Sequence, residues 1–525
     1  MIRVREIKVP IENDNNKYIL KKLSKLLKSE IINYKINKKS IDARDKKNIL
    51  YVYELLVEVE NDNKILNTIK SKNISKYIEE EYIFKITGDK PLEKRPIVVG
   101  SGPAGLFNAY LLAENNYKPI ILERGEKIED RIKSVEYFFE TNKLNTESNI
   151  QFGEGGAGTF SDGKLNTLTK DKHNRHKKVF DIFIENGAPI EISYLNRPHI
   201  GTDILRKVII NMRNKIISLG GEFKYSSKVT DLIIKDNTIK GVEINNNEKL
   251  YSEVVVLAIG HSARDTFYML NKNNIEMKPK NFAVGLRIEH PKELIDKAQY
   301  GEKAILLPPA TYKLTYTTKD NRNVYSFCMC PGGYVVNASS EKNRLCINGM
   351  SNYKRNEKNS NSAIVVNIKT EDYNNDLFGG IELQRKLEEK AYIEGKGLIP
   401  IQLYKDFKDN IKSTTLEEIK PNTKGNYTLS NLNNVLPSFI SDSIKEAIPK
   451  FGKQIHGFDR DDAILLGVEA RTSSPVIIVR DKNFTSSIKG LYPCGEGAGY
   501  AGGITTAAID GVKVAEQIAR TYFTK

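Results

Sequence analysis

Glycines in a fixed spacing mark the first stretch of the sequence that could bind a nucleotide. Gly100, Gly102 and Gly105 form a Gly-x-Gly-x-x-Gly motif directly after the apolar residues 96–99. We expect a short buried strand to end at this motif and a helix to follow over residues 106–115. The three glycines would allow a tight turn, a close approach of the backbone to a pyrophosphate, and close packing of the helix on the strand.

The residues around this motif complete a dinucleotide-binding unit. Pro103 and Ala104 lie inside the motif, where the free N–H groups at the helix N-terminus would face the phosphates. A second apolar run, residues 119–122, ends in Glu123 and Arg124. Glu123 is placed to accept hydrogen bonds from ribose hydroxyls, as an acidic residue does at the end of the second strand of such units.

A second glycine-rich stretch covers residues 151–165. It includes Gly155, Gly156, Gly158 and Ser161, and its glycine content excludes a regular helix or strand. Successive backbone N–H groups in such a loop can form an anion-binding nest. We interpret it as a second phosphate or flavin contact; a flexible surface loop is the alternative.

Two further apolar runs in the sequence end at a glycine. Residues 253–259 read as a strand that stops at Gly260 and His261, where the backbone would meet a cofactor at the sheet edge. Near the end of the chain, an apolar run leads to Gly495 and Glu496, and then to a helix that begins after Gly502, Gly503 and Ile504. Glu496 could bond a ribityl hydroxyl, and the helix N-terminus could stabilise negative charge on a reduced flavin.

Other residues could take part in chemistry, but each also has a structural interpretation. His261 fits a proton-transfer role less well than a structural one, and Cys328 and Cys330 read as buried apolar side chains rather than a redox or metal pair. Residues 471–474 either line the substrate face of a flavin or form a buried turn. The sequence identifies no catalytic base and no cluster with metal-ligand spacing, and it contains neither Gly-x-Ser-x-Gly nor a Walker lysine motif.

Composition limits the class of protein. With 525 residues, the chain is long enough for two or three domains, and its four cysteines predict a reducing, cytoplasmic environment. The formal net charge of +15 could indicate a nucleic-acid partner, but 81 basic residues are dispersed among 66 acidic ones, which argues against it. No apolar run reaches the length of a membrane helix.

The elements that position these residues suggest an α/β protein in which the nucleotide-binding domain is split. Residues 1–90 alternate strands and helices as in a ferredoxin-like α/β module, with a last strand at 82–86. Residues 91–265 form the first part of a Rossmann-like domain, and residues 456–525 form its second part. Between them, short runs in residues 266–455 separated by Gly, Pro and Asn predict a mostly antiparallel α+β insertion.

Taken together, the glycine motif, its acid and the late Gly-Glu loop resemble the FAD-binding flavoproteins of the glutathione-reductase type. This resemblance implies that Gly100, Gly102, Gly105 and Glu123 hold the ADP half of FAD. It also implies that Gly495 and Glu496 meet the ribityl and pyrophosphate groups, and that the backbone of Val229 meets adenine.

More narrowly, the chain resembles a bacterial group of uncharacterised FAD-dependent, or NAD(FAD)-utilising, dehydrogenases. The matching stretches are residues 40–44, 153–165, 330–336, 348–351, 467–476 and 495–504. The resemblance implies an FAD-dependent oxidoreductase with the insertion as a substrate cap, and leaves the substrate open.

One departure from the disulfide reductases narrows the expected activity. Only one well-formed Gly-x-Gly-x-x-Gly unit is present, and no Cys-x₄-Cys follows it. We therefore expect NADH or NADPH, if it is the donor, to visit the flavin transiently. Two alternatives stay open: a flavin-dependent tRNA-modifying enzyme, and a flavin-binding interaction protein without turnover.

Overall fold

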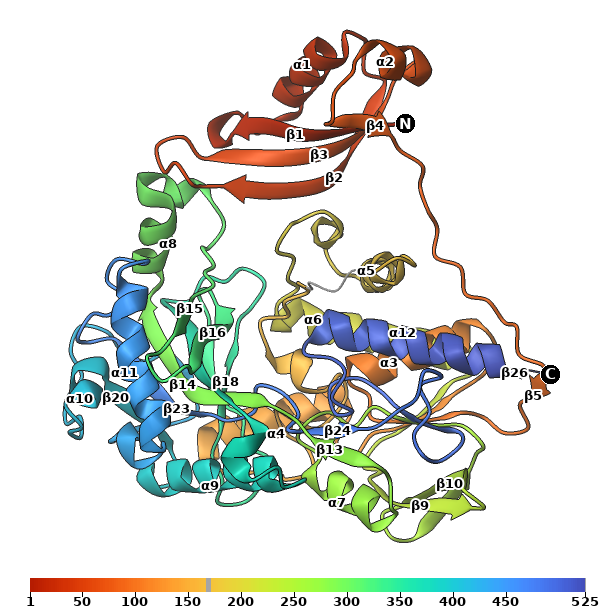
Figure 1. Cartoon of the computed structure of the whole chain (residues 1–525), viewed down its shortest axis with the longest axis vertical. Helices are drawn as coiled ribbons and strands as arrows, with labels where there is room; N and C mark the ends of the chain where they lie inside the picture. The colour runs from red at the N-terminus through yellow and green to blue at the C-terminus, as the bar shows by residue number, and fades with distance from the viewer. Residues whose placement is uncertain (167–170, 525) are drawn as a thin grey trace.

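The computed structural model describes residues 1–166 and 171–524, and it has the mixed α/β architecture expected from the sequence. Figure 1 shows a small N-terminal module, a domain built on a parallel sheet, and a second large sheet domain. We call the last two the parallel-sheet domain and the insertion. Of the helices in the described residues, none combines the length and hydropathy that crossing a bilayer requires.

The N-terminal module is a four-stranded antiparallel sheet in the order β2-β3-β1-β4, covered by two helices. This strand order, with a helix after the first and third strands, is that of a ferredoxin-like α/β sandwich. Helix α1 buries Ile19, Leu23 and Leu27, which recur every four residues and so share one face of the helix. The elements are β1 (Ile2–Pro10), α1 (Asn16–Leu27), β2 (Asn33–Asp42), β3 (Leu50–Glu58), α2 (Asp62–Thr68) and β4 (Ile74–Lys76).

The strand expected at residues 82–86 is not formed, and that prediction was wrong. The chain instead runs extended from the module to the far side of the parallel-sheet domain (Figure 1). The side chains of Tyr82 and Phe84 pack on the core of that domain, and the N–H groups of Thr87 and Gly88 donate to the carbonyl of Ala519. The alternating apolar pattern therefore reflects packing along a helix rather than pairing in a sheet.

Five parallel strands form the centre of the parallel-sheet domain in the order β25-β12-β6-β7-β8. They are β6 (Ile97–Val99), β7 (Ile120–Leu122), β8 (Glu222–Lys224), β12 (Val255–Leu257) and β25 (Leu491–Pro493). The outermost strand of this order comes from the end of the chain, so the domain is assembled from segments almost four hundred residues apart. A three-stranded meander adjoins it, formed by β9 (Val229–Lys235), β10 (Thr238–Ile244) and β11 (Glu248–Tyr251).

Two helices from opposite ends of this domain pack side by side over the sheet (Figure 1). Helix α3 (Pro103–Glu114) is buried from Ala104 to Ala113, because the sheet lies on one side and α12 (Ile504–Thr521) on another. The other helices are α4 (Ile128–Thr141), α5 (Arg175–Glu185), α6 (Thr202–Ser218) and α7 (Arg264–Lys272). Beside them, β5 (Lys90–Pro91) pairs with β26 (Tyr522–Phe523).

The insertion is built on a seven-stranded sheet in the order β15-β16-β19-β14-β23-β20-β22, antiparallel except for the β20–β22 pair. Its strands are β14 (Phe282–Pro291), β15 (Thr315–Thr317), β16 (Asn323–Cys330), β19 (Asn359–Ile368), β20 (Ile399–Leu403), β22 (Tyr427–Leu429) and β23 (Ile464–Glu469). A smaller sheet holds β17 (Tyr334–Asn337), β18 (Ile347–Met350) and β21 (Thr423–Lys424). The helices are α8 (Lys292–Tyr300), α9 (Gly379–Glu394), α10 (Tyr404–Lys408) and α11 (Ser438–Gly452).

The expected limits of the insertion, residues 266–455, need correction at both ends. Strand β13 (Met277–Pro279) pairs with β24 (Val476–Ile478), and α7 packs on the meander of the parallel-sheet domain. Conversely, β23 lies in the large sheet between β14 and β20. A short apolar strand carries no sign in its sequence of which sheet it joins, so the pairing could not be predicted.

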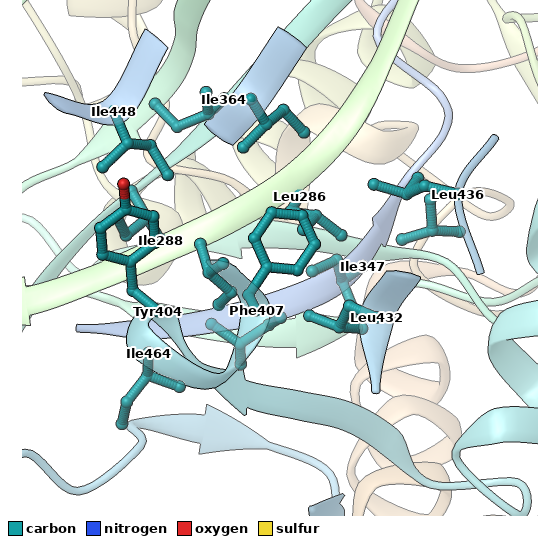
Figure 2. Packing of buried hydrophobic residues seen from close by; sticks show 14 of the residues in the cluster. Leu286, Ile288, Ile347, Ile364, Tyr404, Phe407, Leu432, Leu436, Ile448 and Ile464 are labelled. Carbon is teal, nitrogen blue, oxygen red and sulfur yellow. The ribbon is translucent and has the colours of Figure 1, made fainter. Parts of the chain in front are cut away.

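The core of the insertion holds its central strand rigidly. Every residue of β14 from Phe282 to His290 is buried. Figure 2 shows aliphatic side chains from several strands meeting the rings of Tyr404 and Phe407 of α10. The labelled cluster comprises Leu286, Ile288, Ile347, Ile364, Leu432, Leu436, Ile448 and Ile464 in addition to these two rings. Residues of β14 that face the other way, Arg287 among them, are thereby fixed in position.

Candidate functional site

A cavity of about 380 Å³ lies where the carboxyl ends of the parallel strands face the insertion. Such an edge is where open parallel sheets bind their ligands. Both parts of the chain contribute to the cavity wall. The parallel-sheet domain supplies glycine-rich loops, and the insertion supplies Phe327, Cys328, Asn348 and Glu469.

Most of the residues predicted to bind a cofactor line this cavity together. They are Gly100, Gly102, Pro103, Ala104, Glu123, Arg124, Gly156, Gly158, Ser161, Val229, Gly260, Glu496, Gly502, Gly503 and Ile504. Sequence segments separated by up to four hundred residues therefore meet at one site.

The remaining three predicted residues, Gly105, Gly155 and Gly495, lie behind the cavity wall and do not line it. A Cβ atom on Gly105 would overlap the carbonyl oxygen of Gly100, so this glycine lets helix and strand pack closely. Gly155 donates its N–H to the carbonyl of Ser101 at 2.9 Å, and Gly495 donates to Asp510 Oδ2 at 2.8 Å. These residues shape the loops rather than contact a ligand.

Glu123 joins the first two glycine-rich loops. Its Oε2 accepts hydrogen bonds from the N–H of Ser101 at 3.0 Å and from the Ser101 hydroxyl at 2.7 Å. Its Oε1 accepts from the N–H of Gly125 at 2.9 Å and of Gly153 at 3.0 Å. The sequence predicted a ribose contact for this carboxylate; what the structure shows is that it holds both loops to the end of β7.

Arg131 organises the second loop, a role that the sequence analysis did not predict. Its guanidinium is fully buried and donates to five backbone carbonyls of residues 149–156, at 2.6–3.2 Å. Burial lowers the pKa of Arg131 to about 9, with Glu123 acting in the opposite direction. In the sequence Arg131 is one of several charged residues on helix α4, and only its inward position, next to Ile128 and Val135, could have marked it.

The closing loop contributes Glu496 to the cavity wall. Burial raises the pKa of Glu496 to about 7, and the nearby Lys280 ammonium offsets part of this effect. Lys280 itself donates to the carbonyl of Gly499 at 2.9 Å. The carboxyl group of Glu496 thus faces the cavity, available to a hydroxyl donor.

His261 lies in the cavity wall but is suited to a structural role. Its Nδ1 is 2.9 Å from the hydroxyl of Ser262, which also binds Arg471. Burial lowers the pKa of His261 to about 3, and the neighbouring Arg471 and Arg264 act in the same direction. The imidazole is therefore neutral at physiological pH.

The turn at residues 471–474 divides between the two expected roles. Arg471 and Thr472 line the cavity. Arg471 is also paired with the buried Glu388 of α9 at 2.7 Å. Ser474 instead donates to the carbonyl of Val476 inside the protein.

The two cysteines of strand β16 differ from each other. Cys330 is buried as expected, whereas Cys328 is exposed and lines the cavity. The pairing of β16 with β19 shifts register between Phe327 and Cys330, and Cys328 has φ +43°. This bulge turns Cys328 out of the strand, so its expected burial was wrong.

The features of the cavity fit FAD. Helices α3 and α12 both begin at glycines, Gly102 and Gly503, without a side-chain cap. Their N-terminal N–H groups are therefore available to phosphate or flavin oxygens, in α3 from Ala104 onward because Pro103 has no N–H. A Cβ atom on Gly260 or Gly502 would meet nothing within 4 Å, and one on Gly102 would meet only Gly156 Cα, at 3.8 Å. These glycines leave open space in which a ligand can approach the protein backbone.

Comparison with known families gives two matches. Residues 281–472 match the family described as FAD-dependent protein, C-terminal domain-like. Residues 1–58 match a domain of unknown function, DUF8436. The first match begins at the strand β14 and ends just after β23, in agreement with the limits of the insertion sheet.

Individual proteins show likeness at several levels. A digeranylgeranylglycerophospholipid reductase 1 of Methanococcoides burtonii is 26% identical over 170 residues, 31% of this chain and 36% of that protein. A geranylgeranyl bacteriochlorophyll reductase-like structure from Thermoplasma acidophilum covers 82% of this chain and 78% of its own, at 12% identity and a TM-score of 0.35, too low to support a conclusion. An uncharacterised protein of Clostridium beijerinckii is 45% identical over 532 residues, covering 99% of both chains. The chain therefore belongs to the same family as this clostridial protein, and its cofactor is FAD.

Proposed function

We propose that the protein is an FAD-dependent oxidoreductase of the glutathione-reductase type whose substrate binds between the flavin and the insertion. The observation that carries this proposal is the shared cavity, in which cofactor loops of one domain face polar side chains of the other. A cleft between domains is a usual place for a substrate site. When bound, FAD supplies a two-electron acceptor for hydride transfer.

The protein's own residues would bind the cofactor, orient it and shield its reactive face from water. The N-terminus of α3 and the loop at residues 153–158 would hold the pyrophosphate, and Glu496 would accept a ribityl hydroxyl. The N-terminus of α12 would stabilise negative charge that develops on the flavin. The insertion would cover the reactive face and exclude water.

We further propose that NADH or NADPH reduces the flavin transiently, without a nucleotide domain of its own, in a cytoplasmic enzyme. The single strand-flanked Gly-x-Gly-x-x-Gly unit supports this, because the cavity that contains it is the one proposed for FAD.

Anaerobic mixing of the purified holoenzyme with NADH or NADPH tests the proposal. We expect the absorption band of the oxidised flavin to bleach with one of the two donors. Heat-denatured protein provides the control for free flavin. A flavin that neither nucleotide reduces, although dithionite does, would remove NAD(P)H from the proposal. Lack of turnover with any donor would favour a binding role.

A further inference from the structure

The insertion side of the cavity carries a second group of polar residues that the cofactor does not explain. Lys164 comes from the glycine-rich loop, Cys328 from the β16 bulge, Asn348 from β18 and Glu469 from the end of β23. We call these four residues the cap subsite. We propose that the cap subsite binds a small hydroxy or amino acid, with Lys164 binding its carboxylate and Glu469 accepting its proton. This inference rests on the proposed function.

Arg287 fixes the shape of the cap subsite without contacting the ligand. Its Nε donates to Glu469 Oε2 at 2.8 Å, and its Nη1 donates to Asn361 Oδ1 at 2.7 Å and to the carbonyl of Cys328 at 3.2 Å. Its Nη2 donates to Asn348 Oδ1 at 3.0 Å and to Glu469 Oε1 at 3.4 Å. Four of the five N–H groups of the guanidinium thus make hydrogen bonds of 3.2 Å or less, and the fifth makes only the 3.4 Å contact, so Arg287 is a positioning residue.

Glu469 has one oxygen left for a ligand. Oε2 is held firmly by Arg287, whereas the 3.4 Å contact of Oε1 is long for a hydrogen bond. The side chain lines the cavity although the residue is only 2% exposed. Burial raises the pKa of Glu469, and Arg287 offsets part of this effect, which brings the carboxylate closer to the range of a useful general base.

Lys164 is the cation of the cap subsite whose charge remains available. Its Nζ lies 3.7 Å from Asp162 Oδ2. Asp162 is already neutralised by both guanidinium branches of Arg355 and accepts a further hydrogen bond from Ser351. The other cavity cations have closer carboxylate partners: Arg124 with Glu147 and Asp265, Lys228 with Asp265, and Arg471 with Glu388. A ligand carboxylate would therefore find its partner at Lys164.

The proposed reaction is a two-electron oxidation. The C–H bond at the carbon bearing the hydroxyl or amine breaks, and its electron pair leaves as hydride to the oxidised flavin. The O–H or N–H bond breaks at the same centre, and its proton passes to Glu469 Oε1. A carbonyl or imine forms, so the substrate loses two electrons and the cofactor gains them. The substrate must be small, since the cap subsite shares its cavity with the flavin.

Direct binding of simple anions to the holoenzyme tests the subsite without a known substrate. The probes are acetate, its neutral isostere acetamide, and glycolate. Their binding is measured by the change that it causes in the flavin absorption. We expect acetate and glycolate to bind saturably and acetamide not to bind. Lys164→Met should weaken both anions by about tenfold or more, the usual loss for a partly buried ion pair. Lys342→Met, which removes an exposed lysine outside the cavity, is the matched control.

The pH dependence of acetate binding reports on Glu469. The ionisable groups facing this carboxylate are Arg287, Cys328 and Cys346; burial raises the pKa of the Cys346 thiol to about 12, so this thiol is neutral at neutral pH and below. Acetate should bind more weakly as pH rises and Glu469 ionises, and Glu469→Gln should flatten this profile. The hydroxyl of glycolate should give it an advantage over acetate that shrinks several-fold in Glu469→Gln, since a neutral acceptor binds a donor less strongly.

Several results would overturn the inference. They are equal binding of acetamide and acetate, no spectral response to any anion, unchanged anion affinity in Lys164→Met, or a pH profile that Glu469→Gln leaves intact. If Glu469→Gln does not fold, the comparisons of acetate with acetamide and of the wild type with Lys164→Met still decide whether the subsite binds a carboxylate. Reduction of the flavin by NADH or NADPH is independent of these outcomes, so failure here is distinguishable from failure of the proposed function.

Discussion

Glu123 binds Ser101 twice through a single carboxylate oxygen, which accepts the backbone N–H at 3.0 Å and the hydroxyl at 2.7 Å. Its other oxygen accepts from Gly125 and Gly153. One buried side chain at the end of β7 thus sets the relative position of two loops that face the cofactor. The acid of the dinucleotide motif is therefore part of the scaffold of the site as well as of its surface.

Replacing Glu123 with Gln should loosen both loops. One side-chain oxygen becomes an NH₂ group, which cannot accept hydrogen bonds from backbone N–H donors. Leaving two buried donors unpaired costs about 1–3 kcal/mol each. We expect a lower thermal midpoint of the FAD-free protein and at least a tenfold weaker affinity for FAD, measured by calorimetry and flavin fluorescence. Glu389→Gln, at an exposed position on α9, is the control and should change neither quantity. Unaltered FAD affinity in Glu123→Gln would contradict the scaffold role.

Two glycines of the same motif should respond differently to substitution. Gly102 has φ −71°, and an added Cβ atom has only Gly156 Cα near it, so Gly102→Val should fold. Its side chain would occupy the space of the pyrophosphate, and the protein should purify without FAD. Gly105→Ala should instead destabilise the FAD-free protein, because its Cβ atom would overlap the Gly100 carbonyl. Circular dichroism melting and flavin content separate the two effects. A folded Gly102→Val protein with a full complement of FAD would exclude this site.

Removing Arg131 should be among the most damaging single changes in the protein. Arg131→Met would leave five loop carbonyls without their donor, and breaking such a buried polar network costs about 3–5 kcal/mol. We expect poor FAD retention together with a lower melting temperature. Arg520→Met, at the exposed end of α12, serves as the comparison. If Arg131→Met melted like the wild type, the second loop would be held by other contacts.

The stability of the FAD-free protein should depend on Glu496. Its pKa is about 7 in the folded protein against an ordinary value of 4.5, so the folded state holds this proton more tightly than the unfolded state does. The resulting stabilisation is fully present below pH 4.5 and is lost as pH rises through 7. Glu496→Gln has no ionisable carboxyl group at this position, so its stability does not decrease in this way as pH rises. Between pH 5 and pH 7.5 the melting temperature of the wild type should therefore fall relative to that of Glu496→Gln, and parallel profiles would refute the shift. The buried Glu289, whose pKa is also raised to about 7, is present in both proteins and cancels.

Thiol labelling should locate the cavity independently of the cofactor. Cys328 is exposed in the cavity, whereas Cys330, Cys346 and Cys494 are buried. N-ethylmaleimide should modify Cys328 first, because the reagent can reach this thiol from the cavity. Bound FAD should slow the reaction. Mass spectrometry of digested protein identifies the labelled residue, and earlier labelling of any buried cysteine would argue against the cavity as described.

The sequence predicted the parts of this fold that rest on local rules. Gly100, Gly102 and Gly105 mark the turn, and the apolar run at residues 120–122 with its terminal acid marks the neighbouring strand. Each of these signals lies within a few residues of the element that it defines.

What could not be predicted depends on contacts between distant segments. Arg131 and Glu469 look like ordinary charged residues in their helix and strand, and only the packed structure shows that both are buried against the site. The extended stretch around Tyr82 has the pattern of a strand because it alternates against a helix surface. Strand β23 joins the insertion sheet through partners about sixty and one hundred and eighty residues away, which no local pattern encodes.

The position of β25 beside β12 and of α12 beside α3 has a consequence for how the protein is made in the cell. The N-terminal module contains all its own strands and can fold while the rest of the chain is still being synthesised. The parallel sheet has to wait for residues 491–521, which are synthesised almost four hundred residues after β6. Until then the apolar faces of α3 and β12 lack a partner, and the cofactor has no complete site. The growing chain therefore passes through an exposed intermediate that only residues 491–521 can close.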